Sequence, residues 1–158
     1  MTDFGNPFAV RKQKENISAI MPIVDNTPKM NNIMLDLETM GTGPNAAIVA
    51  IGAVAFDKNE LGRDFYLAIS LGSAVEAGGI MDASTVEWWL QQSEEAKKVF
   101  SGRTTNHFEA LVLFRDWINN YFEPRNVNIW GNGANFDNVI LAQAYKKDTM
   151  PGTMEIYE

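Results

Sequence analysis

Two carboxylates lie within an apolar run in the stretch Ile33-Met34-Leu35-Asp36-Leu37-Glu38-Thr39-Met40-Gly41. Apolar residues alternate there with the positions of the two acids, which is the period of a β-strand. Side chains two residues apart on a strand point to one face, so Asp36 and Glu38 project side by side, about 6.5–7 Å apart. Close carboxylates repel each other and lose hydration, so either one is protonated or a cation lies between them. Mg²⁺ and Mn²⁺ suit such a site because they take oxygen ligands.

A bare Asp-x-Glu pair also fits an edge strand whose acids simply face water. The surrounding sequence favours a central strand instead. Gly41-Thr42-Gly43-Pro44 predicts a turn that brings backbone close to a ligand, and a second apolar segment, 48–56, follows it. A central strand rarely carries acids without a use for them. The pair is therefore a candidate metal site.

The composition is that of one globular domain with a hydrophobic core. The chain has 158 residues, of which 46% are hydrophobic and 21% are charged. It has no cysteine, which excludes disulfides, zinc–thiolate sites and cysteine nucleophiles. The net charge of −7 argues against a histone-like or coating protein but not against a nuclease that grips a few nucleotides through metal ions. We see no membrane span and no secretory signal, and expect a cytoplasmic protein.

The chain order predicts an α/β domain with a mixed central sheet flanked by helices. Residues 1–30 are expected to be a flexible N-terminal extension, residues 31–150 the domain and residues 151–158 a tail. Strands are predicted at 33–38, 48–56, 64–69 and 127–131, the first three as an antiparallel meander. Helices are predicted after the N-cap residues Ser84, Ser93 and Asn106, and a last helix after Asn135 or a neighbour.

A third acid, Asp137, lies in the first turn of the last predicted helix. An acid there is favoured by the helix dipole, and this interpretation needs no function. Yet the preceding segment Trp130-Gly131-Asn132-Gly133 contains glycines at a strand end, which let a helix N-terminus approach other backbone or a ligand. Asp137 is therefore a candidate to face the end of the first strand.

Two motifs resemble those of the DnaQ-like (DEDD) 3′–5′ exonucleases. Asp36-Leu37-Glu38-Thr39 resembles the first motif of that superfamily, and Asn135-Phe136-Asp137 resembles the second. The chain is most similar to the exonuclease VIII-type group of phage and prophage proteins. That similarity runs from Asn31 to about Lys147 and includes Trp88-Trp89-Leu90-Gln91-Gln92-Ser93.

The resemblance implies an RNase H-like fold and a two-metal-ion hydrolysis of phosphodiester bonds at a nucleic-acid 3′ end, in a bacterial or phage-infected cell. Two Mg²⁺ or Mn²⁺ ions would clamp the scissile phosphate and activate a water molecule. The implied catalytic residues and metal ligands are Asp36, Glu38 and Asp137. The implied nucleotide-binding residues are Thr39, Met40, Gly41, Trp88 and Asn135. For the tryptophans, core packing is the alternative, and we favour it for at least one of Trp88 and Trp89.

The chain departs from the family after the second motif. Family members continue into a third motif that supplies a histidine base and a fourth aspartate, whereas the C-terminal part of the fold is expected to be missing here. The single histidine, His107, is expected to be a surface residue in the first turn of an earlier helix. The missing helices would expose apolar surface on Val139 and Ile140. That surface is expected to be covered by the N-terminal segment from Ile17 to Val24, by a second copy of the chain or by a partner protein.

Two functions therefore compete. The first is a 3′–5′ exonuclease, with DNA preferred and RNA as the other substrate. The second is a catalytically inactive, exonuclease-derived phage protein that binds a host protein or a DNA end. The three acids favour the first function, and the absent histidine and fourth acid favour the second.

Overall fold

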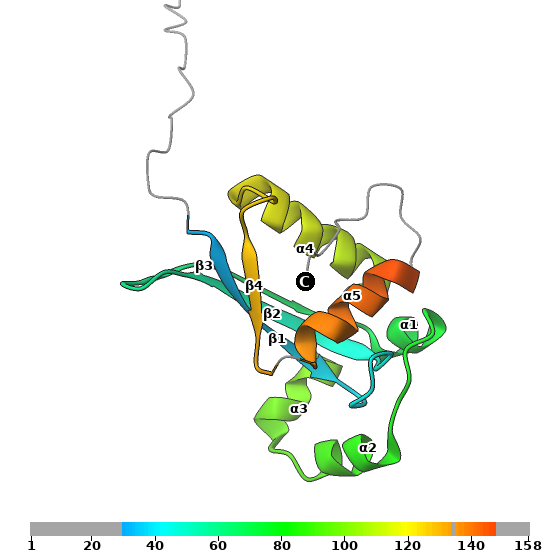
Figure 1. Cartoon of the computed structure of the whole chain (residues 1–158). Helices are drawn as coiled ribbons and strands as arrows, with labels where there is room; N and C mark the ends of the chain where they lie inside the picture. The colour runs from blue at the N-terminus through cyan, green and yellow to red at the C-terminus, as the bar shows by residue number, and fades with distance from the viewer. Residues whose placement is uncertain (1–29, 134, 148–158) are drawn as a thin grey trace, which may run out of the picture.

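The computed structural model describes residues 30–133 and 135–147. The expected N-terminal extension and the tail 151–158 lie outside the described residues, apart from Met30. Figure 1 shows a sheet with helices packed against it and at one of its ends. The strands are β1 (Asn32–Thr39), β2 (Ile48–Phe56), β3 (Leu61–Ala68) and β4 (Asn128–Gly131). The helices are α1 (Leu71–Glu76), α2 (Ala83–Leu90), α3 (Glu94–Ser101), α4 (His107–Tyr121) and α5 (Asp137–Lys147).

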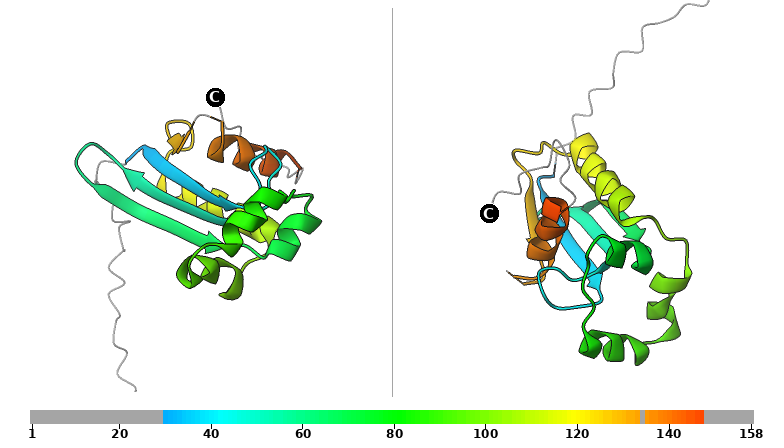
Figure 2. Two further views of the ribbon diagram at one scale, coloured as in Figure 1. Left: turned by 90° about the horizontal axis from the view of Figure 1, so that it is seen from below. Right: turned by 90° about the vertical axis from the view of Figure 1, so that its right-hand side faces the viewer.

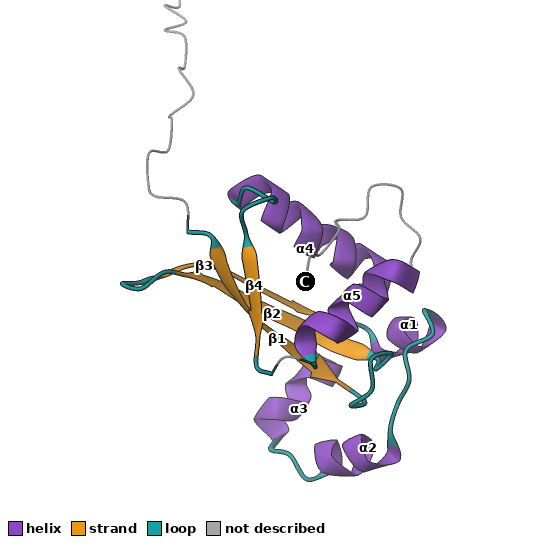
Figure 3. Ribbon diagram, viewed as in Figure 1, coloured by secondary structure: helices purple, strands orange, loops and turns teal. Residues whose placement is uncertain are grey.

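The sheet is mixed, as the sequence predicts, and its strand order is β3-β2-β1-β4 (Figure 3). β1 pairs with β2 and β2 with β3 in antiparallel ladders, which confirms the predicted meander. β4 pairs with β1 in parallel, with Ile33 opposite Ile129 and Leu35 opposite Gly131. β1 is therefore a central strand with a neighbour on each side. The α/β architecture is that of an RNase H-like exonuclease fold.

One face of the sheet is covered by α4 and α5. Leu35, Ala53 and Phe65 stand in one row across three strands and so share this face. The ring of Phe65 lies 5.2 Å from that of Phe114 in α4, measured between centroids. α5 packs on α4, because the buried Tyr145 hydroxyl donates a 2.8 Å hydrogen bond to the Leu111 carbonyl. The hydrophobic core therefore lies between the sheet and these two helices.

The other face of the sheet is largely open. Met34, Tyr66 and Trp130 are on it, and 40%, 64% and 53% of their surfaces are exposed. α2 and α3 lie at one end of the sheet, near the end of β1, as the two views in Figure 2 show. The expectation that Ile140 is exposed is wrong: only 1% of its surface is accessible, because α5 turns it into the core. Exposed apolar side chains occur on the open sheet face and also on helices, for example Leu90 in α2 and Phe108 in α4.

The helix starts are predicted in part. Ser93 and Asn106 cap α3 and α4, since their side chains accept hydrogen bonds from the backbone N–H groups of Ala96 and Phe108. The predicted cap at Ser84 is wrong, because α2 begins two residues earlier after Asp82 and Ser84 lies inside the helix. The short helix α1 is absent from the sequence prediction. Among the described helices, none is long and apolar enough to cross a membrane.

Candidate functional site

Asp36 and Glu38 stand on the open face of the sheet, near the carboxyl end of β1. The neighbouring strand places Gly52 opposite Asp36 and Ala50 opposite Glu38. Asp36 is exposed and Glu38 is half-buried. The alternation of apolar and acidic residues therefore aims both carboxylates away from the core, as the strand period predicts.

Asp137 contacts the same strand although it lies about 100 positions later in the sequence. It is the first residue of α5 and is 1% exposed. Its Oδ1 accepts a 2.9 Å hydrogen bond from the backbone N–H of Leu37, and its Oδ2 accepts one of 2.9 Å from the N–H of Asn132. Two such bonds compensate the burial of a carboxylate, which is otherwise costly. The first turn of a helix also favours negative charge.

Gly131, at the end of β4, allows Asp137 to lie this close to β1. A Cβ atom placed on Gly131 would lie 3.0 Å from both Cβ and Oδ2 of Asp137. Any larger residue at the end of β4 would push the acid away from β1. The glycine noted in the sequence is therefore required by the close packing of the α5 N-terminus on the strand end.

The three acids are close enough to influence one another. The pKa of the Glu38 carboxyl is raised above 4.5, first by burial and then by the negative charges of Asp36 and Asp137. A cation between them would relieve both the desolvation and the repulsion. The structure therefore places Asp137 beside the first strand, as the sequence predicts.

The acids do not form a closed metal cage. Across residues 30–133 and 135–147, no group of three or more His, Cys, Asp and Glu side chains is arranged to hold a metal ion. Both oxygens of Asp137 already accept a backbone N–H, which leaves each with one lone pair. Asp36 and Glu38, by contrast, offer carboxylate oxygens on an accessible face, and those are donors of the kind that Mg²⁺ and Mn²⁺ prefer.

The end of β1 is fixed by a tryptophan from α2. The buried Trp89 donates a 2.9 Å hydrogen bond from its indole Nε1 to the carbonyl of Thr39. Thr39 in turn donates from its hydroxyl to the Gly41 carbonyl at 2.7 Å. Of the expected nucleotide-binding residues, Thr39 and Met40 are therefore buried, with 7% and 4% of their surfaces exposed.

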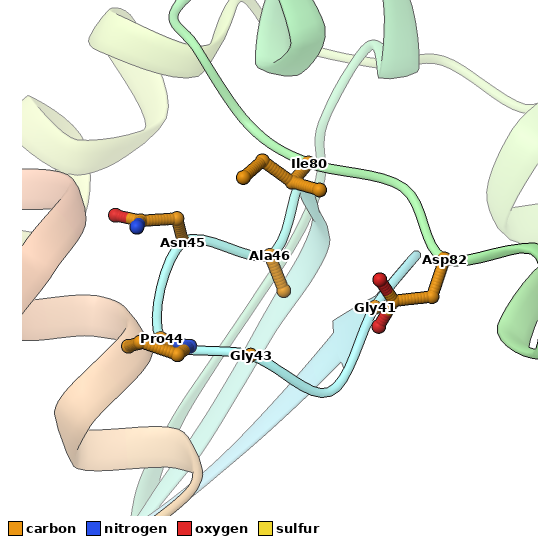
Figure 4. Close-up of a pocket in the computed structure, with 7 residues that line it drawn as sticks. All are labelled: Gly41, Gly43, Pro44, Asn45, Ala46, Ile80 and Asp82. Atoms are coloured by element: carbon orange, nitrogen blue, oxygen red, sulfur yellow. The ribbon is translucent and has the colours of Figure 1, made fainter.

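Beside this strand end lies a small hollow of about 160 Å³, drawn in Figure 4. It is lined by the loop after β1, including Gly41 and Pro44, and by Ile80 and Asp82. The Asp82 carboxylate accepts a 2.8 Å hydrogen bond from the backbone N–H of Thr42. The same residue that precedes α2 therefore fixes the loop that follows the acidic strand.

These features agree with a match to a known family. Residues 31–157 match the family described as the 3′–5′ exoribonuclease Rv2179c-like domain. The chain belongs to this exonuclease family. The family belongs to the DnaQ-like group, so the resemblance inferred from the two acidic motifs is confirmed.

A phage relative supports the same assignment. The chain is 32% identical over 123 residues to a protein of Enterobacteria phage T4 named exodeoxyribonuclease. The match covers 71% of this chain and 54% of that protein. The chain thus spans about half the length of this curated relative.

Two other predicted nucleotide-binding residues of this exonuclease domain are accessible. Trp88 is 52% exposed and packs edge-on against the buried Trp89, with 5.0 Å between ring centroids. The expectation that at least one of the two tryptophans packs in the core is therefore confirmed. Asn135 is exposed just before α5. Their binding of a nucleotide stays a prediction.

His107 does not match its expectation. It is the first residue of α4 and only 7% exposed, so the prediction of a surface position is wrong. Its backbone N–H donates a 3.0 Å hydrogen bond to the hydroxyl of Ser73 in α1, which draws the helix start against the body of the exonuclease domain. The short helix α1, which the sequence did not predict, thus accounts for its burial.

The sequence reasoning also missed basic residues near the acids. A hollow of about 410 Å³ is lined by the acids Glu38 and Glu95 and by the basic residues Lys98 and Arg103. Lys98 belongs to α3, and Arg103 follows it. Sequence spacing gives no signal for these two residues, since they lie 60 and 65 positions after Glu38 and approach it only through the fold.

Proposed function

We propose that the domain is a metal-dependent 3′–5′ exonuclease that hydrolyses the phosphodiester bond at a nucleic-acid 3′ end. The observation that carries the proposal is the convergence of Asp36, Glu38 and Asp137 at the carboxyl end of β1, where burial and then the other two charges raise the pKa of Glu38. Membership of an exonuclease family supports it. Structural acids alone would not need to be gathered at a cost in electrostatic repulsion.

Asp36 and Glu38 are the proposed direct ligands of Mg²⁺ or Mn²⁺. Asp137 contributes its negative charge and the oxygen lone pairs that the backbone N–H groups of Leu37 and Asn132 do not use. Two bound divalent ions would polarise the scissile phosphate and lower the pKa of an attacking water molecule. The hydrogen bonds from Trp89 and Thr39 hold the strand end beneath the terminal nucleotide.

The proposed substrate is DNA, with RNA as the second choice. The name of the phage T4 relative supports DNA, whereas the description of the matched family supports RNA. A protein distinguishes the two through a contact to the ribose 2′-hydroxyl. Comparing oligonucleotides of one sequence in both chemistries answers this question directly.

The test follows the shortening of oligonucleotides labelled at the 5′ or the 3′ end, as DNA and as RNA, in Mg²⁺ or Mn²⁺. Wild type is expected to yield a ladder from the 5′-labelled strand and labelled mononucleotide from the 3′-labelled strand. Asp36→Asn keeps the size of the side chain but removes its charge, and is expected to abolish both. Cleavage that survives this substitution, or that starts at the 5′ end, contradicts the proposal.

A second function is favoured by two observations. The single histidine of the chain is buried at the start of α4, and no described trio of acids is arranged to hold a metal ion. The alternative is a catalytically inactive protein that binds a DNA end or a host protein, as a monomer or with a second copy covering the open sheet face. Well-folded wild type that binds a 3′ end but does not cleave it in either metal would establish this alternative.

A further inference from the structure

We propose that the hollow between β3 and α3 seats one unpaired nucleotide next to the scissile phosphate. In this proposal Lys98 and Arg103 contact the phosphate of that nucleotide and Tyr66 stacks on its base. The inference rests on the proposed function, because it names the binding site for the same substrate. It assigns roles to three residues that neither acidic motif contains.

The volume of the hollow is large enough for one nucleotide. Its volume of about 410 Å³ lies within the range of roughly 300–1,000 Å³ found for small-molecule sites. Glu38 lines one side, so an occupant of the hollow lies against the acidic strand.

Tyr66 lies on the same face of the sheet as the acids, two strands away from Asp36. Asp36, Gly52 and Tyr66 stand in one row across β1, β2 and β3. Neighbouring strands lie about 4.8 Å apart, so the Tyr66 backbone is roughly 10 Å from that of Asp36. A Cβ on Gly52 would lie 3.4 Å from the Asp36 carbonyl oxygen and 4.0 Å from Cδ2 of Tyr66, so the tyrosine ring lies beside the glycine in the middle of the row. A base that stacks on the tyrosine ring would therefore lie over this row, beside the acidic strand.

The side chain of Tyr66 is largely exposed to solvent. Its surface is 64% accessible, although it lines the hollow. Large aromatic side chains on an open sheet face are typical platforms for the bases of single strands, since every base presents a π-face. An unpaired base resting on Tyr66 would bury this ring.

Lys98 and Arg103 provide the positive charge that a phosphate group needs. Lys98 makes an exposed ion pair with Glu95 at 2.5 Å, and such exposed pairs contribute little and exchange readily. Arg103 makes no ion pair with any described residue. In a protein of net charge −7, two cations beside the acids are where a phosphate would be held.

The experiment measures binding without requiring cleavage. A fluorescent single-stranded DNA oligonucleotide with a free 3′ end is titrated with the full chain in Ca²⁺, and anisotropy is followed over a range of KCl concentrations. The Lys98→Gln/Arg103→Gln variant is compared with a Lys58→Gln/Arg125→Gln control. Lys58 and Arg125 are exposed, and the control removes the same charge at the opposite end of the sheet.

The first variant is expected to raise Kd about tenfold and to reduce the slope of log Kd against log salt by about 1.4, the value for two lost contacts to a single strand. The control is expected to change neither. Tyr66→Ala is expected to raise Kd about tenfold, and Tyr66→Phe, which keeps the ring, to leave it unchanged. A first variant that behaves as the control does overturns the inference, as does wild type that does not bind the oligonucleotide.

The two proposals fail separately. Asp36-dependent cleavage by wild type, combined with unchanged binding in the Lys98/Arg103 variant, removes the nucleotide seat and leaves the exonuclease. Binding that depends on Lys98, Arg103 and the Tyr66 ring, without any cleavage in Mg²⁺ or Mn²⁺, leaves the seat and removes the exonuclease.

Discussion

The carboxylate of Asp137 accepts a hydrogen bond from the backbone N–H of Leu37, the residue between the two acids of β1, at 2.9 Å and across 100 positions of sequence. This bond joins the start of α5 to the acidic strand. It makes Asp137 a structural residue as well as a candidate catalytic one. A substitution there affects both properties.

Asp137→Ala is therefore expected to lower the free energy of unfolding by about 1–3 kcal/mol, because it leaves the buried N–H of Leu37 and the partly buried N–H of Asn132 without their acceptor. Urea denaturation followed by circular dichroism measures the change. Asp116→Ala, which removes a half-buried acid from α4, serves as the control and is expected to cost less. Equal stabilities of the two variants would mean that water replaces the Asp137 carboxylate at low cost.

Asp36→Asn tests catalysis with less effect on stability than a substitution of Asp137. Asp36 is exposed, and substitutions at exposed positions usually change stability by no more than about 0.5 kcal/mol. We expect an unchanged melting temperature and a loss of cleavage of at least about 100-fold, measured as kcat/KM on a labelled oligonucleotide. Loss of activity together with a lowered melting temperature would instead indicate a folding defect.

Glu38 predicts how stability depends on pH. Because its pKa is raised above 4.5 by burial and by two neighbouring carboxylates, the folded protein binds this proton more tightly than the unfolded chain does. That stabilisation is complete below the unfolded pKa and is lost as pH rises through the raised value. The metal-free Glu38→Gln variant should therefore melt at a higher temperature than wild type at pH 8, and the difference should shrink toward pH 4.

Differential scanning calorimetry in EDTA measures this difference, with the exposed Glu76→Gln variant as the control. Addition of Mg²⁺ should then raise the melting temperature of wild type more than that of the Glu38→Gln variant. A wild type that is the more stable of the two at pH 8 in EDTA would contradict the electrostatic account.

Trp89→Phe tests how the strand end is held. Phenylalanine keeps most of the buried ring but cannot donate the 2.9 Å hydrogen bond to the Thr39 carbonyl. We expect a loss of about 1–2 kcal/mol in stability. Cleavage should weaken mainly through kcat, because the loosened backbone follows Glu38 directly. Trp88→Phe, at the exposed neighbour, is the control and should leave stability unchanged.

The sequence predicted those parts of the fold that local patterns determine. The alternation around Asp36 and Glu38 predicted β1 and its two faces, and the apolar run 48–56 predicted β2. Ser93 and Asn106 were recognised as helix caps because a side-chain oxygen and the first free N–H groups of a helix lie close in sequence. Asp137 was placed near β1 through its motif and the glycines before it.

The missed features depend on contacts between distant segments. Ser84 looked like a cap, but Asp82 begins α2 and binds the N–H of Thr42, 40 positions away. α1 has only six residues, with Gly72 inside it and Gly78 after it, and no local pattern distinguishes it from a loop. Lys98 and Arg103 come near Glu38 only because α3 lies at the end of the sheet.

The bond between Leu37 and Asp137 also provides a spectroscopic probe. An amide hydrogen that is bound to a side chain of another element exchanges with solvent when the two elements separate. The exchange rate of the Leu37 amide thus reports how often the amino end of α5 leaves the sheet. Every such opening removes the third acid from the other two, so hydrogen exchange at this single amide measures the fraction of time for which the acidic triad is assembled.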